Sequence, residues 1–128
     1  MIAARLIAIF LACWVIGTVA AADTYPARPL RIVVPFPPGG GVDTLARIVG
    51  QKISPSLGQP VVIENRAGAT GIIGTGLVAR SSADGYTLLV GTAGPMTIAG
   101  ASGRKLGYDP LKDFSSITMG VQLPPSVV

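Results

Sequence analysis

Apolar residues along this chain follow two periods, one typical of strands and one typical of helices. Three short apolar runs indicate buried strands: Leu30 to Val34, Pro60 to Asn65, and Tyr86 to Val90. Between them, apolar residues recur three or four positions apart from Val42 to Leu57 and again from Ile72 to Ala79, which predicts two helices. The chain therefore alternates strand, helix, strand, helix and strand, the order of a βαβαβ unit.

The first predicted helix carries its own stop signals. Gly58 follows the last apolar residue and is well placed to end the helix, because glycine readily adopts the left-handed conformation of a C-terminal cap. Pro55 lies inside the same stretch, and a proline in a helix interior costs about 3 kcal/mol. We therefore expect the regular helix to stop near Ser54 or to bend there.

Beyond Ile98 the periodic pattern weakens. Gly100 to Pro110 is expected to form a loop and Leu111 to Phe114 a turn. Ser115 to Met119 could form a short strand, and another apolar run begins at Pro124.

Each predicted strand opens into a loop of small residues. These loops are Pro35 to Asp43, Arg66 to Gly71, and Gly91 to Pro95. Right-handed crossovers would make the three strands parallel, so that all three loops lie at the carboxyl edge of the sheet. Ligands bind at that edge in open α/β sheets. The sequence thus predicts an α/β fold, with a mostly parallel sheet flanked by helices.

The loop from Pro35 to Asp43 is suited to an anion. Its prolines stiffen the backbone, while Gly39 to Gly41 allow a ligand to approach main-chain amides closely. The helix that follows turns its positive dipole end toward the loop. A stiff connector is the alternative for this loop alone, because short glycine motifs are weak signals. The threefold repetition of strand and small-residue loop favours binding.

The first 22 of the 128 residues are typical of an export signal. Arg5 gives a basic start, Leu6 to Ile16 is apolar, and the alanines that end at Ala22 form a cleavage site. The alternative is a membrane anchor, but the run broken at Gly17 is shorter than the roughly 20 residues that a bilayer needs. We expect cleavage near Ala22, which would remove Cys13 and leave a mature protein without thiol chemistry.

The charges exclude a nucleic-acid role. The net charge is +4, and the lysines and arginines are scattered in runs no longer than two, with no interleaved aromatics. We expect no nucleic-acid partner.

Catalytic and cofactor chemistry also find little support. The chain has no histidine, which excludes the usual catalytic triads and zinc sites. The acidic residues do not cluster, and Asp43 is best explained as a cap of its own helix. No glycine precedes a Lys-Ser or Lys-Thr pair, and Gly71, Gly74 and Gly76 follow the order G-x-x-G-x-G rather than the dinucleotide order G-x-G-x-x-G. We expect no enzyme activity, metal or cofactor.

Five segments together resemble the Bug family of extracytoplasmic solute receptors, the substrate-binding proteins of tripartite tricarboxylate transporters. The resemblance covers essentially the whole predicted mature chain. The segments are Tyr25 to Arg31, Val34 to Asp43, Leu57 to Arg66, Asp84 to Leu89, and Tyr108 to Phe114.

The resemblance implies a periplasmic binding protein of type II, in which two α/β lobes close around a small carboxylated molecule. Members of the family are two to three times as long as this chain. Residues 23–128 are therefore expected to form the first lobe only, from a truncated reading frame or an incomplete gene model. Membrane transporter subunits are possible partners of such a receptor.

The resemblance also implies which residues face the ligand. Backbone amides of the first loop would hold a carboxylate directly or through water, and two further loops would complete the site. The implied ligand-binding residues are Phe36, Gly39, Gly40, Gly41, Val42, Asp43, Ala69, Thr70, Gly71, Thr92, Ala93 and Gly94. Ala67 and Ala83 stand where the family commonly has proline, and Pro55 interrupts the first helix, which hints at relaxed constraint.

Three hypotheses remain open. A solute receptor would bind a small carboxylate without turnover, and a Rossmann-like enzyme would need a cofactor that the failed fingerprint argues against. A non-functional fragment is the third. The sequence does not name the ligand.

Overall fold

Three short parallel strands form the centre of the fold. The computed structural model describes residues 24–122, so the predicted export signal, Cys13 and the last six residues lie outside the described part. The strands are β1 (Leu30–Val34), β2 (Val61–Asn65) and β3 (Thr87–Leu89), in the spatial order β2-β1-β3. Both neighbours run parallel to β1, which confirms the predicted βαβαβ order.

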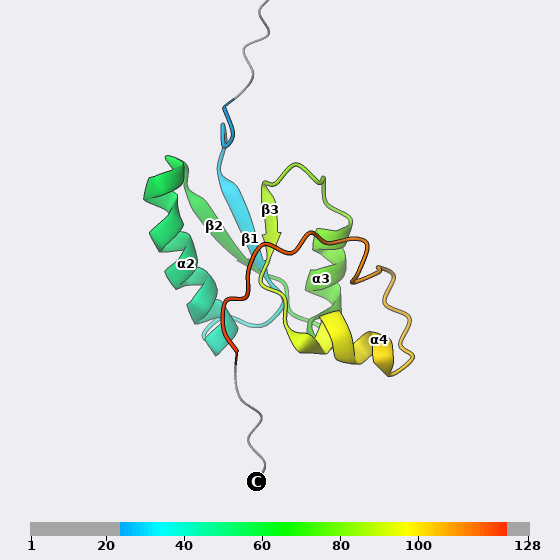
Figure 1. Cartoon of the computed structure of the whole chain (residues 1–128). Helices are drawn as coiled ribbons and strands as arrows, with labels where there is room; N and C mark the ends of the chain where they lie inside the picture. Colours follow the sequence, from blue (N-terminus) through cyan, green and yellow to red (C-terminus); the bar gives the residue numbers. More distant parts are fainter. Residues whose placement is uncertain (1–23, 123–128) are drawn as a thin grey trace, which may run out of the picture.

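Helices follow each strand and cover both faces of the sheet. These helices are α2 (Gly41–Leu57), a 3₁₀ turn η2 (Ala69–Gly71) that runs into α3 (Ile72–Ala79), and a π-helical turn η3 (Gly94–Ile98) that runs into α4 (Ala99–Ala101). Figure 1 shows α2 and α3 on opposite sides of the strands. The closing segment then crosses from α4 toward α2, where Gly120 lies against Leu45.

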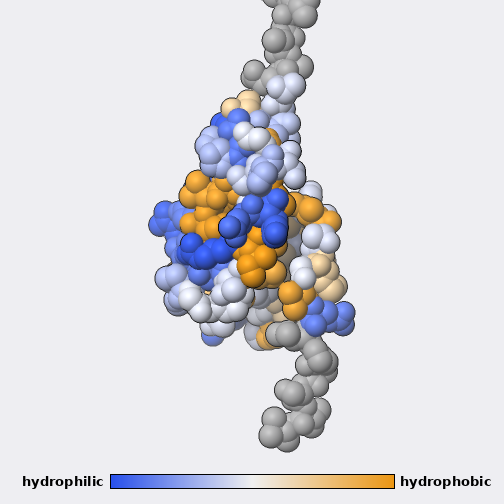
Figure 2. Space-filling view, turned by 90° about the vertical axis from the view of Figure 1, so that its left-hand side faces the viewer, coloured by the Kyte–Doolittle hydropathy of each residue, from blue (hydrophilic) through white to orange (hydrophobic). Residues whose placement is uncertain are grey.

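The core lies between β1 and α2. Ile32 and Val34 of β1 and Ala46 of α2 are buried together, because alternate strand residues face the same helix stripe. On the other face of the sheet, Val33 and Thr75 are completely buried, which places α3 directly against β1. The outer face of α2 mixes exposed apolar residues such as Ile48 with charged ones (Figure 2).

The first helix runs through Pro55 to Leu57, so the expectation that it stops near Ser54 is wrong. Pro55 lies in the last turn, where its fixed φ suits a helix and only one backbone hydrogen bond is lost. Its carbonyl accepts a hydrogen bond from Gly58, which caps the helix in the left-handed conformation as predicted. The Ser54 hydroxyl donates to the Gln59 carbonyl at 2.8 Å and further ties down this end.

The chain beyond β3 differs from the sequence expectation in two places. The third loop runs into helical turns that extend to Ala101, past the point where a loop was predicted. The turn around Leu111 is present, but Ser115 to Met119 carries no strand. Ile117 is 78% exposed and Met119 is 75% exposed, so this stretch lacks the sheet partner and buried face that a strand requires.

Side-chain contacts fix the chain before and after β3. Before the strand, the Tyr25 hydroxyl donates to the Gly85 carbonyl at 2.7 Å, and Arg28 pairs with Asp84 and stacks on the Tyr86 ring. After it, the Tyr108 hydroxyl donates to the Pro95 carbonyl at 2.8 Å. These contacts join segments far apart in the sequence and fix the chain before β3 and at the end of the third loop.

Candidate ligand-binding site

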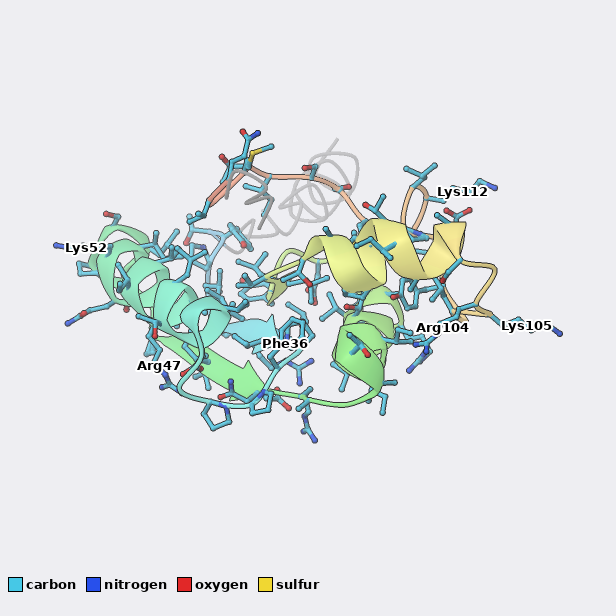
Figure 3. All side chains as sticks on the ribbon, turned by 90° about the horizontal axis from the view of Figure 1, so that it is seen from below. Phe36, Arg47, Lys52, Arg104, Lys105 and Lys112 are labelled. Carbon is cyan, nitrogen blue, oxygen red and sulfur yellow. The ribbon has the colours of Figure 1, made fainter. Side chains whose placement is uncertain are left out.

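The three loops that follow the strands lie together at the carboxyl edge of the sheet. A Cβ atom placed on Gly71 in the second loop would lie 3.3 Å from the Phe36 ring and 3.2 Å from Pro95, the last residue of the third loop. Figure 3, which looks onto this edge, places Phe36 between the helices. The predicted convergence of the loops is confirmed, because residues more than 20 positions apart meet here.

The first loop presents free backbone amides. Gly39 has a φ of 91°, and a Cβ atom on Gly39, Gly40 or Gly41 would meet nothing within 4 Å. Gly40 is the N-cap of α2 and offers no side chain to the helix start. The amides of Gly41, Val42 and Asp43 have no hydrogen-bond acceptor among residues 24–122. These donors and the helix dipole make the edge suited to an anion.

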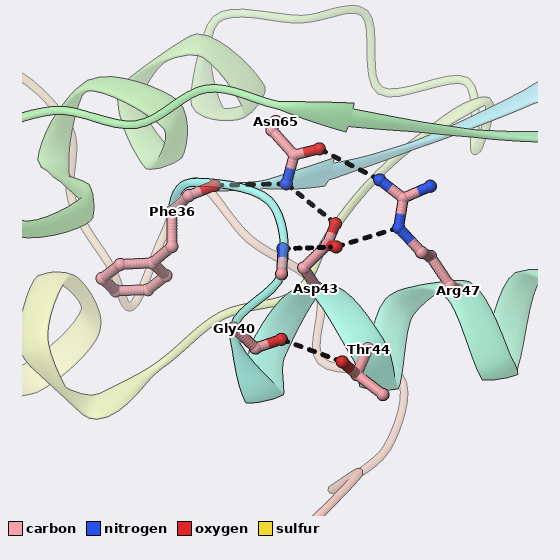
Figure 4. A network of polar contacts seen from close by, with 7 residues as sticks. Phe36, Gly40, Asp43, Thr44, Arg47 and Asn65 are labelled. Atoms are coloured by element: carbon pink, nitrogen blue, oxygen red, sulfur yellow. Dashed lines mark hydrogen bonds and ion pairs between the residues drawn. The ribbon is translucent and has the colours of Figure 1, made fainter.

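Asp43 turns away from this open surface and into a polar network (Figure 4). Its side chain is buried, and the residue is 3% exposed. One carboxylate oxygen accepts the Gly39 amide and the Arg47 Nε, both at 2.9 Å, and the other accepts the Asn65 Nδ2 at 2.9 Å. The hydrogen bond from Arg47, followed by those from Gly39 and Asn65, holds the pKa of Asp43 far below its usual range. The carboxylate is thus charged and fully occupied.

Asn65 links the same network to the sheet. Its Nδ2 also donates to the Phe36 carbonyl at 3.2 Å, and its Oδ1 accepts from Arg47 at 3.4 Å. The parallel register places Asn65 beside Val34, the last residue of β1, directly under the loop. Sequence reasoning missed Asn65 and Arg47. The signals for them were an amide at the carboxyl end of a predicted parallel strand and an i, i+4 pair with Asp43.

The second loop has a strained backbone. Ala69 and Thr70 have φ of 46° and 58°, and Gly71 follows with a φ of 92°. Consecutive left-handed residues that are not glycine cost free energy, and such strain is typical of functional sites. Ala69 and Thr70 are exposed, whereas Gly71 is buried against the other two loops. The Ala69–Thr70 backbone is thus exposed at the edge while Gly71 anchors it.

The third loop adds a polar group and a helical turn. The Thr92 hydroxyl is buried and has no hydrogen-bond partner within the described residues. The Thr92 carbonyl accepts the Met96 amide at 3.2 Å, which starts the helical turn that contains Gly94. A Cβ on Gly94 would lie 3.8 Å from the Thr70 carbonyl, so the second and third loops are neighbours.

The predicted site residues divide by exposure. Gly39, Gly40, Gly41, Ala69, Thr70 and Ala93 are exposed, Phe36, Val42, Thr92 and Gly94 are partly buried, and Asp43 and Gly71 are buried. The exposed members have short side chains or none, so what the edge offers a ligand is mainly backbone. Backbone amides and a hydroxyl can bind an anion by hydrogen bonding.

Other features lie away from this edge. A shallow groove of about 520 Å³ runs between α2 and β2 and is lined by Gln51, Ser54 and Val61 among others. In the part of the chain that the structure describes, no three His, Cys, Asp or Glu side chains gather as metal ligands. No helix there has the length and apolar character to cross a membrane.

A parallel sheet with loops gathered at its carboxyl edge is also found in the lobes of periplasmic binding proteins, and comparison with solved structures bears on this chain. The described fold is similar to the solved periplasmic binding protein BugD, with a TM-score of 0.67 and 44% identity over 70% of this chain and 30% of that one. It is equally similar to MatC from Rhodopseudomonas palustris, solved with bound malate, with a TM-score of 0.67 and 44% identity. That match covers 70% of this chain and 31% of MatC.

Sequence comparison gives the family. Residues 45–128 match the tripartite tricarboxylate transporter family receptor, TctC. BugT of Bordetella pertussis (strain Tohama I) is 45% identical over 119 residues, which cover 92% of this chain and 36% of BugT. The chain belongs to the TctC family of solute-binding receptors, and the Bug resemblance is confirmed. It spans about a third of the length of the curated relatives that it matches.

Proposed function

We propose that this chain provides a carboxylate-binding surface of an extracytoplasmic solute receptor for a tripartite tricarboxylate-type transporter. The observation that carries the proposal is the convergence of three loops at one sheet edge, with free amides at the start of α2. Family membership and the malate bound to MatC support a carboxylate as the ligand.

The carboxylate would accept hydrogen bonds from the amides of Gly41, Val42 and Asp43, helped by the dipole of α2. Thr70 lies exposed on the neighbouring second loop and would contact the rest of the ligand. Such a site binds and releases its ligand without turnover, since it supplies donors but neither a nucleophile nor a base.

Export to the periplasm is part of the proposal. The basic start, apolar stretch and alanines of residues 1–22 support a signal peptide cleaved near Ala22. The periplasmic binding proteins among its structural neighbours support the same location. Residues 23–128 would then act as an N-terminal lobe, and membrane subunits of the transporter would be its partners.

The experiment is a titration of protein recovered from the periplasm of cells that express the full 128-residue sequence. Malate, succinate, adipate and citrate are added while amide shifts are followed by NMR, with neutral malamide as the matched control. The described loops contact a ligand from one side only, so water competes and we expect dissociation constants in the millimolar range. Shifts should centre on the first loop and spare the α2–β2 groove.

Two results would contradict the proposal. One is equal response to malamide and malate, because the amides are proposed to recognise charge. The other is the absence of any carboxylate-dependent shift in the three loops. Mass spectrometry of the same preparation checks export, since an amino terminus close to Asp23 is expected and an intact Met1 would contradict cleavage.

A further inference from the structure

The glycines of the first loop have no side-chain packing to hold them, although Phe36 and Val42 on either side of them pack against the core. The Cβ positions of Gly39, Gly40 and Gly41 are surrounded by open space, and a left-handed glycine can adopt many other conformations. Yet the free amides that follow it must keep a fixed direction if they are to bind a carboxylate. Something other than packing therefore has to fix the backbone at Gly39 to Gly41.

We infer that Asp43 and Asn65 are positioning residues, which hold the first loop so that the amides at the start of α2 face the ligand. Neither side chain would contact the ligand itself. This inference rests on the proposed function, because it assigns a role to residues behind the proposed carboxylate site.

Asp43 fixes the backbone at the glycine end of the loop. Its carboxylate accepts the Gly39 amide at 2.9 Å, the one amide of the three glycines with an acceptor among the described residues. A hydrogen bond to a charged acceptor is stronger than a neutral one, so it can offset the freedom of a glycine backbone. With three donors on its two oxygens and 3% exposure, Asp43 has no room for a ligand.

Asn65 fixes the backbone at the other end of the loop and links the loop to the sheet. The same Nδ2 donates to the Phe36 carbonyl and to Asp43, so both sides of the loop are attached to one side chain. Asn65 itself is fixed as the last residue of β2, and the next amide, that of Arg66, donates to the Val34 carbonyl at 2.8 Å. The direction of the free amides is thus set by the rigid end of the sheet.

Glu64 offers a matched control in the neighbouring position of β2. It too is a carboxylate bonded to arginines, here Arg31 and Arg66, but alternation along the strand turns it to the opposite face. Glu64→Gln therefore removes a charge and its ion pairs without touching the first loop. Asp43→Asn removes the charge that holds Gly39.

The experiment compares unchanged protein, Asp43→Asn, Asn65→Ala and Glu64→Gln, all recovered from the periplasm. Without ligand, hydrogen exchange of the Gly39 amide should rise about tenfold in Asp43→Asn, since one charge-assisted bond is lost, and stay unchanged in Glu64→Gln. Malate affinity, measured by NMR under conditions where each variant is folded, should fall about tenfold in Asp43→Asn and in Asn65→Ala. Glu64→Gln should bind like the unchanged protein.

The inference is overturned if Gly39 exchange is the same in Asp43→Asn and unchanged protein, or if Glu64→Gln weakens malate binding as much as Asp43→Asn does. Should Asp43→Asn fail to fold, Asn65→Ala gives the same test through the Phe36 carbonyl. Failure of the proposed function is distinct, because the unchanged protein itself would then show no carboxylate-dependent shifts. The ligand-free exchange of Gly39 still decides whether the network holds the loop.

Discussion

The first and second loops of the site are held in opposite ways. The first loop touches almost nothing through its glycines and is fixed by hydrogen bonds from Asp43 and Asn65. The second loop is fixed by contact, because Gly71 packs against Phe36 and Pro95 and its backbone takes left-handed conformations at Ala69 and Thr70. Glycines in the first loop keep space open, whereas glycines in and after the second allow close packing.

The difference teaches that a glycine-rich sequence does not by itself indicate a ligand contact. At Gly74 the neighbour that requires glycine is the protein's own backbone, and at Gly40 no neighbour requires it. Space that the fold does not fill is the better sign of a binding surface. Substitutions by alanine distinguish glycines that allow close packing from glycines that keep a surface open.

The largest effect is expected for Gly74→Ala. The new Cβ would lie 2.6 Å from the Arg66 carbonyl and 2.9 Å from the Pro35 Cα, so backbone must move and the free energy of unfolding should fall by about 3 kcal/mol. Urea denaturation measures the change. Gly41→Ala, also in the first turn of a helix but facing open space, is the control and should not lower stability. Equal loss in both variants would break the comparison.

The next prediction compares the stability of two alanine variants at neighbouring glycines in the first loop. Gly39→Ala should cost about 1–2 kcal/mol, because its φ of 91° is unfavourable for a residue with a side chain. Gly40→Ala should leave stability unchanged, since Gly40 has an ordinary φ of −83° and no crowding. Both methyl groups should weaken carboxylate binding in an NMR titration. Unaltered affinity in Gly40→Ala would show that the open space is not the ligand surface.

A smaller effect of opposite sign is expected in the second loop. Thr70→Gly relieves a left-handed β-branched residue, and after the entropy cost of glycine the net gain in unfolding free energy should be about 0.5 kcal/mol. Carboxylate affinity should fall, because the loop becomes less ordered. Thr97→Gly, within the helical turn η3, is the control and should lower stability. A loss in Thr70→Gly would show that the strain is not significant.

The last prediction concerns pH. The pKa of Asp43 is depressed below the ordinary value of 3.8, so the unfolded chain binds a proton first as the pH falls. Its stabilisation is fully present above about pH 5 and is lost progressively below about pH 4. Thermal unfolding should show a constant gap between unchanged protein and Asp43→Asn from pH 8 to 5, and a shrinking gap below pH 4. A gap that closes near pH 6 would contradict this.

Much of the fold could be predicted from local pattern. The three strands, the end of α2 at Gly58 and the shared edge of the loops follow from periodicity and the handedness of crossovers. The helical turns after Gly94 could not, because glycine, proline and alanine give little periodicity there. Their place depends on a distant contact, the bond from Tyr108 to the Pro95 carbonyl.

The position of the candidate site could be predicted, but which residues would face the ligand and which would hold the loop could not. Loop composition indicated where a ligand would bind, and Asp43 was expected both to cap its helix and to face the ligand. The Asp43–Asn65 network depends on the register that sets Asn65 beside Val34, and register is a property of paired strands rather than of one segment. A carboxylate one helical turn before an arginine was the available hint.

The central place of β1 has a consequence for the order of folding. β1, α2 and β2 are consecutive in the chain and contact one another, so residues 30–65 can assemble through short loop closures. β3 joins β1 only after the crossover through α3, and it brings the third loop with it. The first loop can therefore form early, whereas the complete edge exists only after the last strand has docked. Ligand-binding competence is thus expected to arise at the end of folding rather than gradually along it.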